Sequence, residues 1–88
     1  MNDNDVEEMT FTDVLNLINI IFVKNEGIEI VDRVRIYVIE TLKNNELKID
    51  LLTLLDKIKV SLIENNPACV SLYIEEFREK VYKLLSQN

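Results

Sequence analysis

Carboxylate pairs are the residues of this 88-residue chain whose spacing could support chemistry. Glu75 and Glu79 are four residues apart, and Glu26, Glu29 and Asp32 are spaced by three, so each set shares one face if its segment is helical. Such carboxylates could hold Mg²⁺ or act as an acid and a base. Nothing else in the sequence converges on either set. We therefore interpret both as solvated helix surface and expect no metal site.

Other catalytic residue types are scarce. The chain has no histidine, so Ser/His/Asp and Cys/His arrangements and the usual structural zinc sets are excluded within it. Its single glycine excludes the glycine-rich loops that cradle phosphates. The only cysteine, Cys69, follows the only proline closely and is interpreted as a small residue packed at a helix start rather than a reactive thiol. We predict a protein that is not an enzyme and needs no cofactor.

Negative charge is concentrated near the N-terminus. Four acidic residues lie within the first eight positions, and the rest of the chain has twelve acidic against ten basic residues, so most of the net charge of −6 belongs to the start. We predict that residues 1–9 form an acidic, disordered tail that favours a basic partner. Direct nucleic-acid binding is not expected, because no basic stripe is present to neutralise phosphates.

The sequence also bears on location. One cysteine allows no internal disulfide, and the acidic start lacks the basic region of a secretory signal, so an intracellular location is predicted, cytoplasmic or nuclear if the source is eukaryotic. The apolar run from Leu15 to Val23 is interrupted by Asn16 and Asn19 and is too short to span a bilayer. We expect no membrane contact.

Short polar breaks at residues 24–27, 43–46 and 64–67 divide the chain into four segments of similar length. Each break contains asparagine, which tolerates left-handed backbone and caps helices. One glycine and one proline are too few for the turns of an all-β fold. The pattern predicts an all-α fold, a small bundle of about four short helices forming a single domain over residues 10–88. The expected helices cover residues 11–24, 28–43, 47–64 and 67–86.

Helix starts are marked by two local signals. Thr10 and Asp13 are spaced as a capping box, with aspartate where glutamate is usual, and Asn66 with Pro67 forms an N-cap followed by proline at the first helical position. The second segment is less clear because it is β-branched. Its alternative is a β-hairpin formed by residues 17–23 and 28–39, in an α+β fold. We favour the helix, because a two-stranded hairpin is only marginally stable.

Helical periodicity separates an apolar stripe in each segment from apolar residues that lie off it. Arg35 falls inside the second stripe, where it must extend to water or find a carboxylate, and Ser61 is expected off the third stripe. The predicted core residues are Phe11, Val14, Leu15, Ile18, Ile21, Phe22, Val31, Val34, Val38, Leu42, Leu47, Leu51, Leu54, Leu55, Ile58, Leu62, Val70, Tyr73, Ile74, Phe77, Val81 and Leu84, with Ile28 and Ile39 flanking the second stripe.

The surplus apolar residues predict a contact with another chain. A domain this small has much surface to cover, yet 48% of its residues are hydrophobic. The predicted partner-binding residues are Asn16, Asn19, Ile20, Val23, Ile36 and Tyr37. We predict a non-enzymatic protein–protein interaction module, either a small regulator or inhibitor or an adaptor subunit. The alternative is an obligate helical homodimer with a structural role, joined through the first helix.

Overall fold

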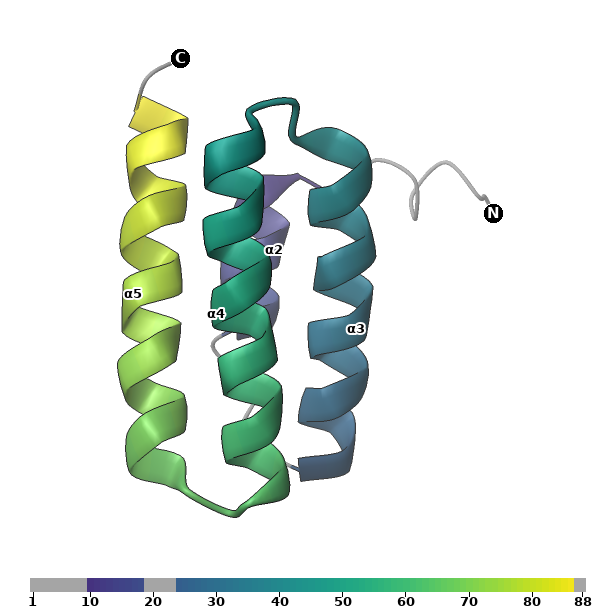
Figure 1. The fold of residues 1–88 in the computed structure, drawn as a ribbon, viewed down its shortest axis with the longest axis vertical. Helices are drawn as coiled ribbons and strands as arrows, with labels where there is room; N and C mark the ends of the chain where they lie inside the picture. Colours follow the sequence, from purple (N-terminus) through teal and green to yellow (C-terminus); the bar gives the residue numbers. More distant parts are fainter. Residues whose placement is uncertain (1–9, 19–23, 87–88) are drawn as a thin grey trace.

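The computed structural model describes residues 10–18 and 24–86, and this part of the chain is an all-α bundle (Figure 1). Its helices are α2 (Phe11–Ile18), α3 (Lys24–Thr41), α4 (Asn45–Ile63) and α5 (Pro67–Ser86). The predicted fold class is confirmed. The hairpin alternative is wrong, because residues 28–39 lie within α3 and residues 17 and 18 within α2. The predicted tail, residues 1–9, lies outside the described residues.

The helices are arranged around one core. Helix α4 lies between α3 and α5, joined to each by a short turn, so neighbouring helices run antiparallel (Figure 1). Helix α2 lies behind α4 in this view and contacts α3 and α5. The radius of gyration is 12.7 Å. This arrangement leaves the side of α4 that faces the viewer uncovered by any other described helix.

Side-chain caps fix where the helices begin. The Thr10 amide donates to the Asp13 carboxylate over 3.0 Å and the Asp13 amide donates to the Thr10 hydroxyl over 3.3 Å, which is the predicted reciprocal box. The Asn44 side chain accepts from the Leu47 amide, and the Asn66 side chain accepts from the Cys69 amide. Each cap satisfies an amide that has no partner within its helix.

The turn between α4 and α5 depends on asparagine. Asn65 has φ of 56°, and its amide donates to the Leu62 carbonyl while the Asn66 amide donates to the Ser61 carbonyl. These two bonds form a Schellman motif, in which a left-handed residue ends the helix and satisfies its last carbonyls. Asn66 then caps α5, so one short polar break ends one helix and starts the next.

The first predicted break is wrong. Residues 24–27 form the first turn of α3, which begins at Lys24 rather than at residue 28. The only glycine, Gly27, is buried there and has no positive φ, so it does not end a helix. A glycine inside a helix costs only about 1 kcal/mol, which packing readily offsets. Helix α4 also begins two residues earlier than predicted, at Asn45.

Periodicity identified the core well. The buried apolar residues come from all four helices and from Leu42, which directly follows α3. Every one is a predicted core residue: Val14, Leu15, Ile18, Val31, Val34, Val38, Leu42, Leu51, Leu54, Leu55, Ile58, Leu62, Val70, Ile74, Phe77 and Val81. Two predictions are wrong. Ser61 is buried, because the start of α5 covers that flank of α4, and Ile39 is exposed, because no neighbour reaches the edge of the α3 stripe where it lies. Ile21 and Phe22 lie outside the described residues.

Candidate functional site

Three of the six predicted partner-binding residues lie in the part of the chain that the structure describes. Asn16 is exposed on α2, and Ile36 is 57% exposed on α3. Tyr37, next to Ile36, is half-buried. Asn19, Ile20 and Val23 lie outside the described residues, so the predicted contact of the first helix stays a prediction. Of the predicted set, the structure places Ile36 and Tyr37 together on one helix.

Tyr37 is held by the contact between α2 and α3. Its ring meets the Phe11 ring edge-on, with centroids 5.0 Å apart and planes at 70°. Burial raises the pKa of Tyr37 above its ordinary value, and the negative charge of Asp13 acts in the same direction. Its ring therefore supports the α2–α3 packing, which leaves Ile36 as the freely exposed member of the pair.

The outer face of α3 carries charge around Ile36. Four residues at helical spacing, Glu29, Arg33, Ile36 and Glu40, are all exposed on this face, and Tyr37 borders them. Two carboxylates and one guanidinium give the face a net negative charge. Ile39 lies one turn beyond Ile36 and is also exposed. The outer face of α3 is thus an apolar centre within an acidic margin.

Ion pairs join α3 to α4 beside this face. Arg35 pairs with Asp56, and Lys59 Nζ lies 3.2 Å from Asp32 Oδ1. The prediction that Arg35 finds a carboxylate is confirmed. All four side chains remain partly exposed, so each pair contributes little to stability. Their charges cancel, so this edge of the bundle carries no net charge.

Helix α4 exposes apolar side chains that the sequence alone did not single out as a set. Ile49 is 61% exposed and Val60 51%, and Ile63 is exposed one turn further on. Neither Ile49 nor Val60 is among the predicted partner-binding residues. The signal was present in the spacing, because Ile49, Thr53, Asp56 and Val60 are separated by four, three and four residues and are all exposed. We call these four residues the outer row of α4.

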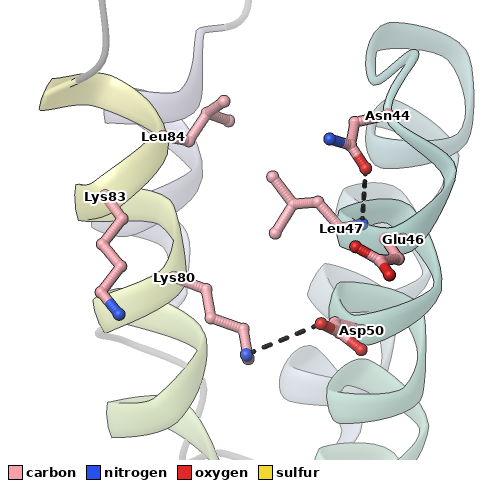
Figure 2. Close-up of a pocket in the computed structure, with 7 residues that line it drawn as sticks. All are labelled: Asn44, Glu46, Leu47, Asp50, Lys80, Lys83 and Leu84. Atoms are coloured by element: carbon pink, nitrogen blue, oxygen red, sulfur yellow. Dashed lines mark hydrogen bonds and ion pairs between the residues drawn. The ribbon is translucent and has the colours of Figure 1, made fainter.

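Two clefts lie between α4 and α5, one near each end of their contact. The first, of about 260 Å³, lies between the start of α4 and the end of α5 (Figure 2). Lys80 Nζ reaches across it to Asp50 Oδ2 at 3.7 Å. Its lining residues are Asn44, Glu46, Leu47, Asp50, Lys80, Lys83 and Leu84. Two lysines and two carboxylates balance one another, so the cleft has no net charge with which to attract an ion.

The second cleft, of about 300 Å³, lies near the turn between α4 and α5. Cys69 and the buried Ser61 line it together with Val60 and Tyr73. Lys57 Nζ lies 5.5 Å from the centre of the Tyr73 ring, a cation–π contact that joins the two helices. The cysteine is half-buried, as expected for a small residue packed at a helix start.

Within residues 10–18 and 24–86, no group of three or more histidine, cysteine or acidic residues is placed to hold a metal ion. None of the helices in those ranges is long and apolar enough to cross a membrane. Comparison of the chain with protein-family models, curated proteins and solved structures gives no match.

Proposed function

We propose that this chain is a non-enzymatic interaction module that binds another protein, as a small regulator, inhibitor or adaptor subunit. The observation that carries the proposal is the outer face of α3, where Ile36 is 57% exposed and Ile39 46% exposed beside it. Isolated exposed apolar residues are normal on protein surfaces, but two large ones at a helical spacing of three form a continuous contact.

The charge around these isoleucines suggests the chemistry of the partner. Glu29 and Glu40 flank Ile36 along the helix, and only Arg33 opposes them on this face. The chain as a whole has a net charge of −6. A partner with a basic rim around an apolar centre would therefore be attracted over a distance and oriented on contact.

The area available sets the strength of the contact. Fully burying an isoleucine is worth about 1.5–3 kcal/mol, and Ile36 and Ile39 have about half of that left to gain. Together they supply roughly 1.5–3 kcal/mol, whereas association costs at least about 4 kcal/mol in lost freedom of motion. The partner must therefore also contact neighbouring residues, and the exposed Glu29, Arg33 and Glu40 lie on the same face.

Affinity capture from an extract of the source cells tests this proposal. The bait is the full chain, compared with the double variant Ile36→Asp/Ile39→Asp and with Leu72→Asp as a control. Leu72 is 55% exposed on α5, so its substitution introduces the same kind of charge at a similar exposure away from α3. Circular dichroism checks that all three proteins keep their helical content.

The expected result is a protein retained by the wild type and by Leu72→Asp but lost with the double variant. Capture of the same proteins by all three baits would contradict the proposed surface. Capture lost equally with Leu72→Asp would place the contact elsewhere on the molecule.

A further inference from the structure

The outer row of α4 faces away from the core and lies midway between the two neighbouring helices. On one flank, Asp56 and Lys59 pair with residues of α3, and on the other, Asp50 pairs with Lys80 of α5. Ile49, Thr53 and Val60 lie between the two flanks, Asp56 borders the flank toward α3, and all four residues are exposed. Figure 1 shows that one side of α4 is covered by no other described helix, and the exposure of these four residues agrees with a position on that side.

Two copies of this row complement each other when one of them is reversed. Spacings of four, three and four residues are the same in both directions, and their average of about 3.7 residues is close to one helical turn, so the row follows one face of α4. If a second copy of α4 runs antiparallel to the first, Ile49 of each copy faces Val60 of the other, and Thr53 faces Asp56. Apolar side chains meet apolar ones, and a hydroxyl donor meets a carboxylate acceptor.

We propose that the outer row of α4 binds the same row of a second copy of this chain, antiparallel, about a two-fold axis between Thr53 and Asp56. A two-fold contact requires one patch that complements itself, which this row provides. The proposal goes beyond the interaction module described above, because it uses α4 rather than the outer face of α3 and a second copy rather than another protein.

The charges near the outer row permit a second copy to bind there. Two chains of charge −6 repel each other over most of their surfaces. Beside the outer row, however, Arg35 neutralises Asp56 and Lys59 neutralises Asp32, so two copies can meet there without a net like-charge contact. An ionised carboxylate has room for about four hydrogen bonds, so Asp56 can keep Arg35 and also accept from Thr53 of the other copy.

The same reversal limits the size of the contact. It places Ile63 opposite Glu46, so the apolar contact ends there. Two isoleucine–valine pairs and two threonine–aspartate pairs make a small interface, and small interfaces form weak, reversible complexes. We expect a dissociation constant on the order of 10–100 µM.

Cysteine cross-linking of the full chain tests the register. The background variant is Cys69→Ser, which removes the only native thiol. Ile49→Cys and Val60→Cys are made separately in that background. In the proposed pair these two positions face each other, whereas two copies of position 49 lie about 16 Å apart along the axis, beyond the roughly 7 Å that a disulfide spans. The variants are oxidised singly and as an equal mixture.

The expected result is a disulfide-linked dimer in the mixture, at least tenfold more abundant than in either variant alone. Thr53→Cys provides a second readout, because two copies of position 53 lie only about 4.5 Å apart along the axis and should cross-link by themselves. Ile49→Cys and Val60→Cys each linking to itself would show a parallel pair and overturn the proposal. Equal linking in all samples, or none in any, would also overturn it. None of these outcomes depends on capture of another protein through α3.

Discussion

Helices α4 and α5 contribute similarly to the core but differ on the outside. Helix α4 has 19 residues and α5 has 20, and each buries one stripe of aliphatic or aromatic side chains. The exposed side of α5 carries four charged residues, three of them acidic: Glu75, Glu76, Glu79 and Lys83. The outer row of α4 begins and ends with exposed isoleucine and valine. The buried stripe of a helix therefore does not determine its outer face, and the outer face distinguishes a solvated helix from one that offers a contact.

The difference lies in arrangement rather than in the number of exposed apolar residues. Helix α5 also exposes two large ones, Leu72 and Tyr82. They are ten residues apart, and the exposed residues at helical spacing between them, Glu75 and Glu79, are both acidic, so two antiparallel copies of this row would place carboxylate against carboxylate. Single exposed residues of this kind are normal and need no partner.

The largest expected effects are on stability and come from substitutions in the core that α4 and α5 share. Ile58 of α4 and Phe77 of α5 are both 0% exposed. We expect Ile58→Ala to lower the free energy of unfolding by about 2–5 kcal/mol and Phe77→Ala by about 3–5 kcal/mol, since each leaves a cavity in the core. Urea denaturation followed by circular dichroism measures both. A loss below about 1 kcal/mol for either variant would mean that the helices do not share the core as described.

The outer faces should respond differently to the same change. We expect Ile49→Asp/Val60→Asp to weaken self-association at least 100-fold, which is about 2.7 kcal/mol, because four buried apolar side chains per dimer are replaced by like charges. Leu72→Asp/Tyr82→Asp should leave self-association unchanged. Sedimentation velocity measures both. Equal self-association of the two double variants would mean that α4 offers no contact that α5 lacks.

Two aspartates of α4 provide a matched pair. Asp50 and Asp56 have side chains 55% and 57% exposed, and each pairs with a basic residue of a neighbouring helix. Each substitution by alanine should lower the free energy of unfolding by less than about 1 kcal/mol. Only Asp56→Ala should weaken self-association, by about tenfold, because it removes the acceptor for Thr53. An equal effect of Asp50→Ala on self-association would contradict the proposed register.

A smaller effect, on the pH dependence of stability, is expected from Tyr37 at the contact between α2 and α3. Burial raises the pKa of Tyr37, so the unfolded chain releases this proton at lower pH than the folded one. The resulting stabilisation is complete below a pH of about 10 and is lost as the pH rises through the pKa of the folded protein. Tyr37→Phe lacks this term, so above pH 10 the wild type should lose stability more steeply than the variant. Parallel pH profiles in urea denaturation would show that Tyr37 is not buried by Phe11.

Sequence periodicity predicted the part of the structure that depends on local rules. The four helices, the caps at Thr10 and Asn66 and the buried stripes follow from side-chain spacing and capping chemistry, which act within one or two turns. Whether a residue at the edge of a stripe is buried depends on how the neighbouring helices pack. Ser61 is buried because α5 covers it, and Gly27 continues a helix because packing offsets its flexibility.

The candidate site was harder to predict for the same reason. Ile36 was recognised because it lies opposite its stripe, whereas Ile39 was assigned to the edge of the core and is exposed. Ile49 stands between the stripe residues Leu47 and Leu51 but on the opposite side of the helix, so its spacing marked it as lying off the stripe. Which apolar residues remain exposed depends on how far the neighbours of a helix reach around it, and one segment read alone does not contain that information.

Sedimentation equilibrium of the full chain from about 1 µM to 1 mM tests the central claim most directly, namely that the outer row of α4 is a contact surface. We expect the mass of the wild type to rise from 10.3 kDa toward twice that value with increasing concentration. The mass of Ile49→Asp/Val60→Asp should stay at 10.3 kDa. A wild-type mass of 10.3 kDa throughout the series, or a rise that the double variant shares, would contradict this claim.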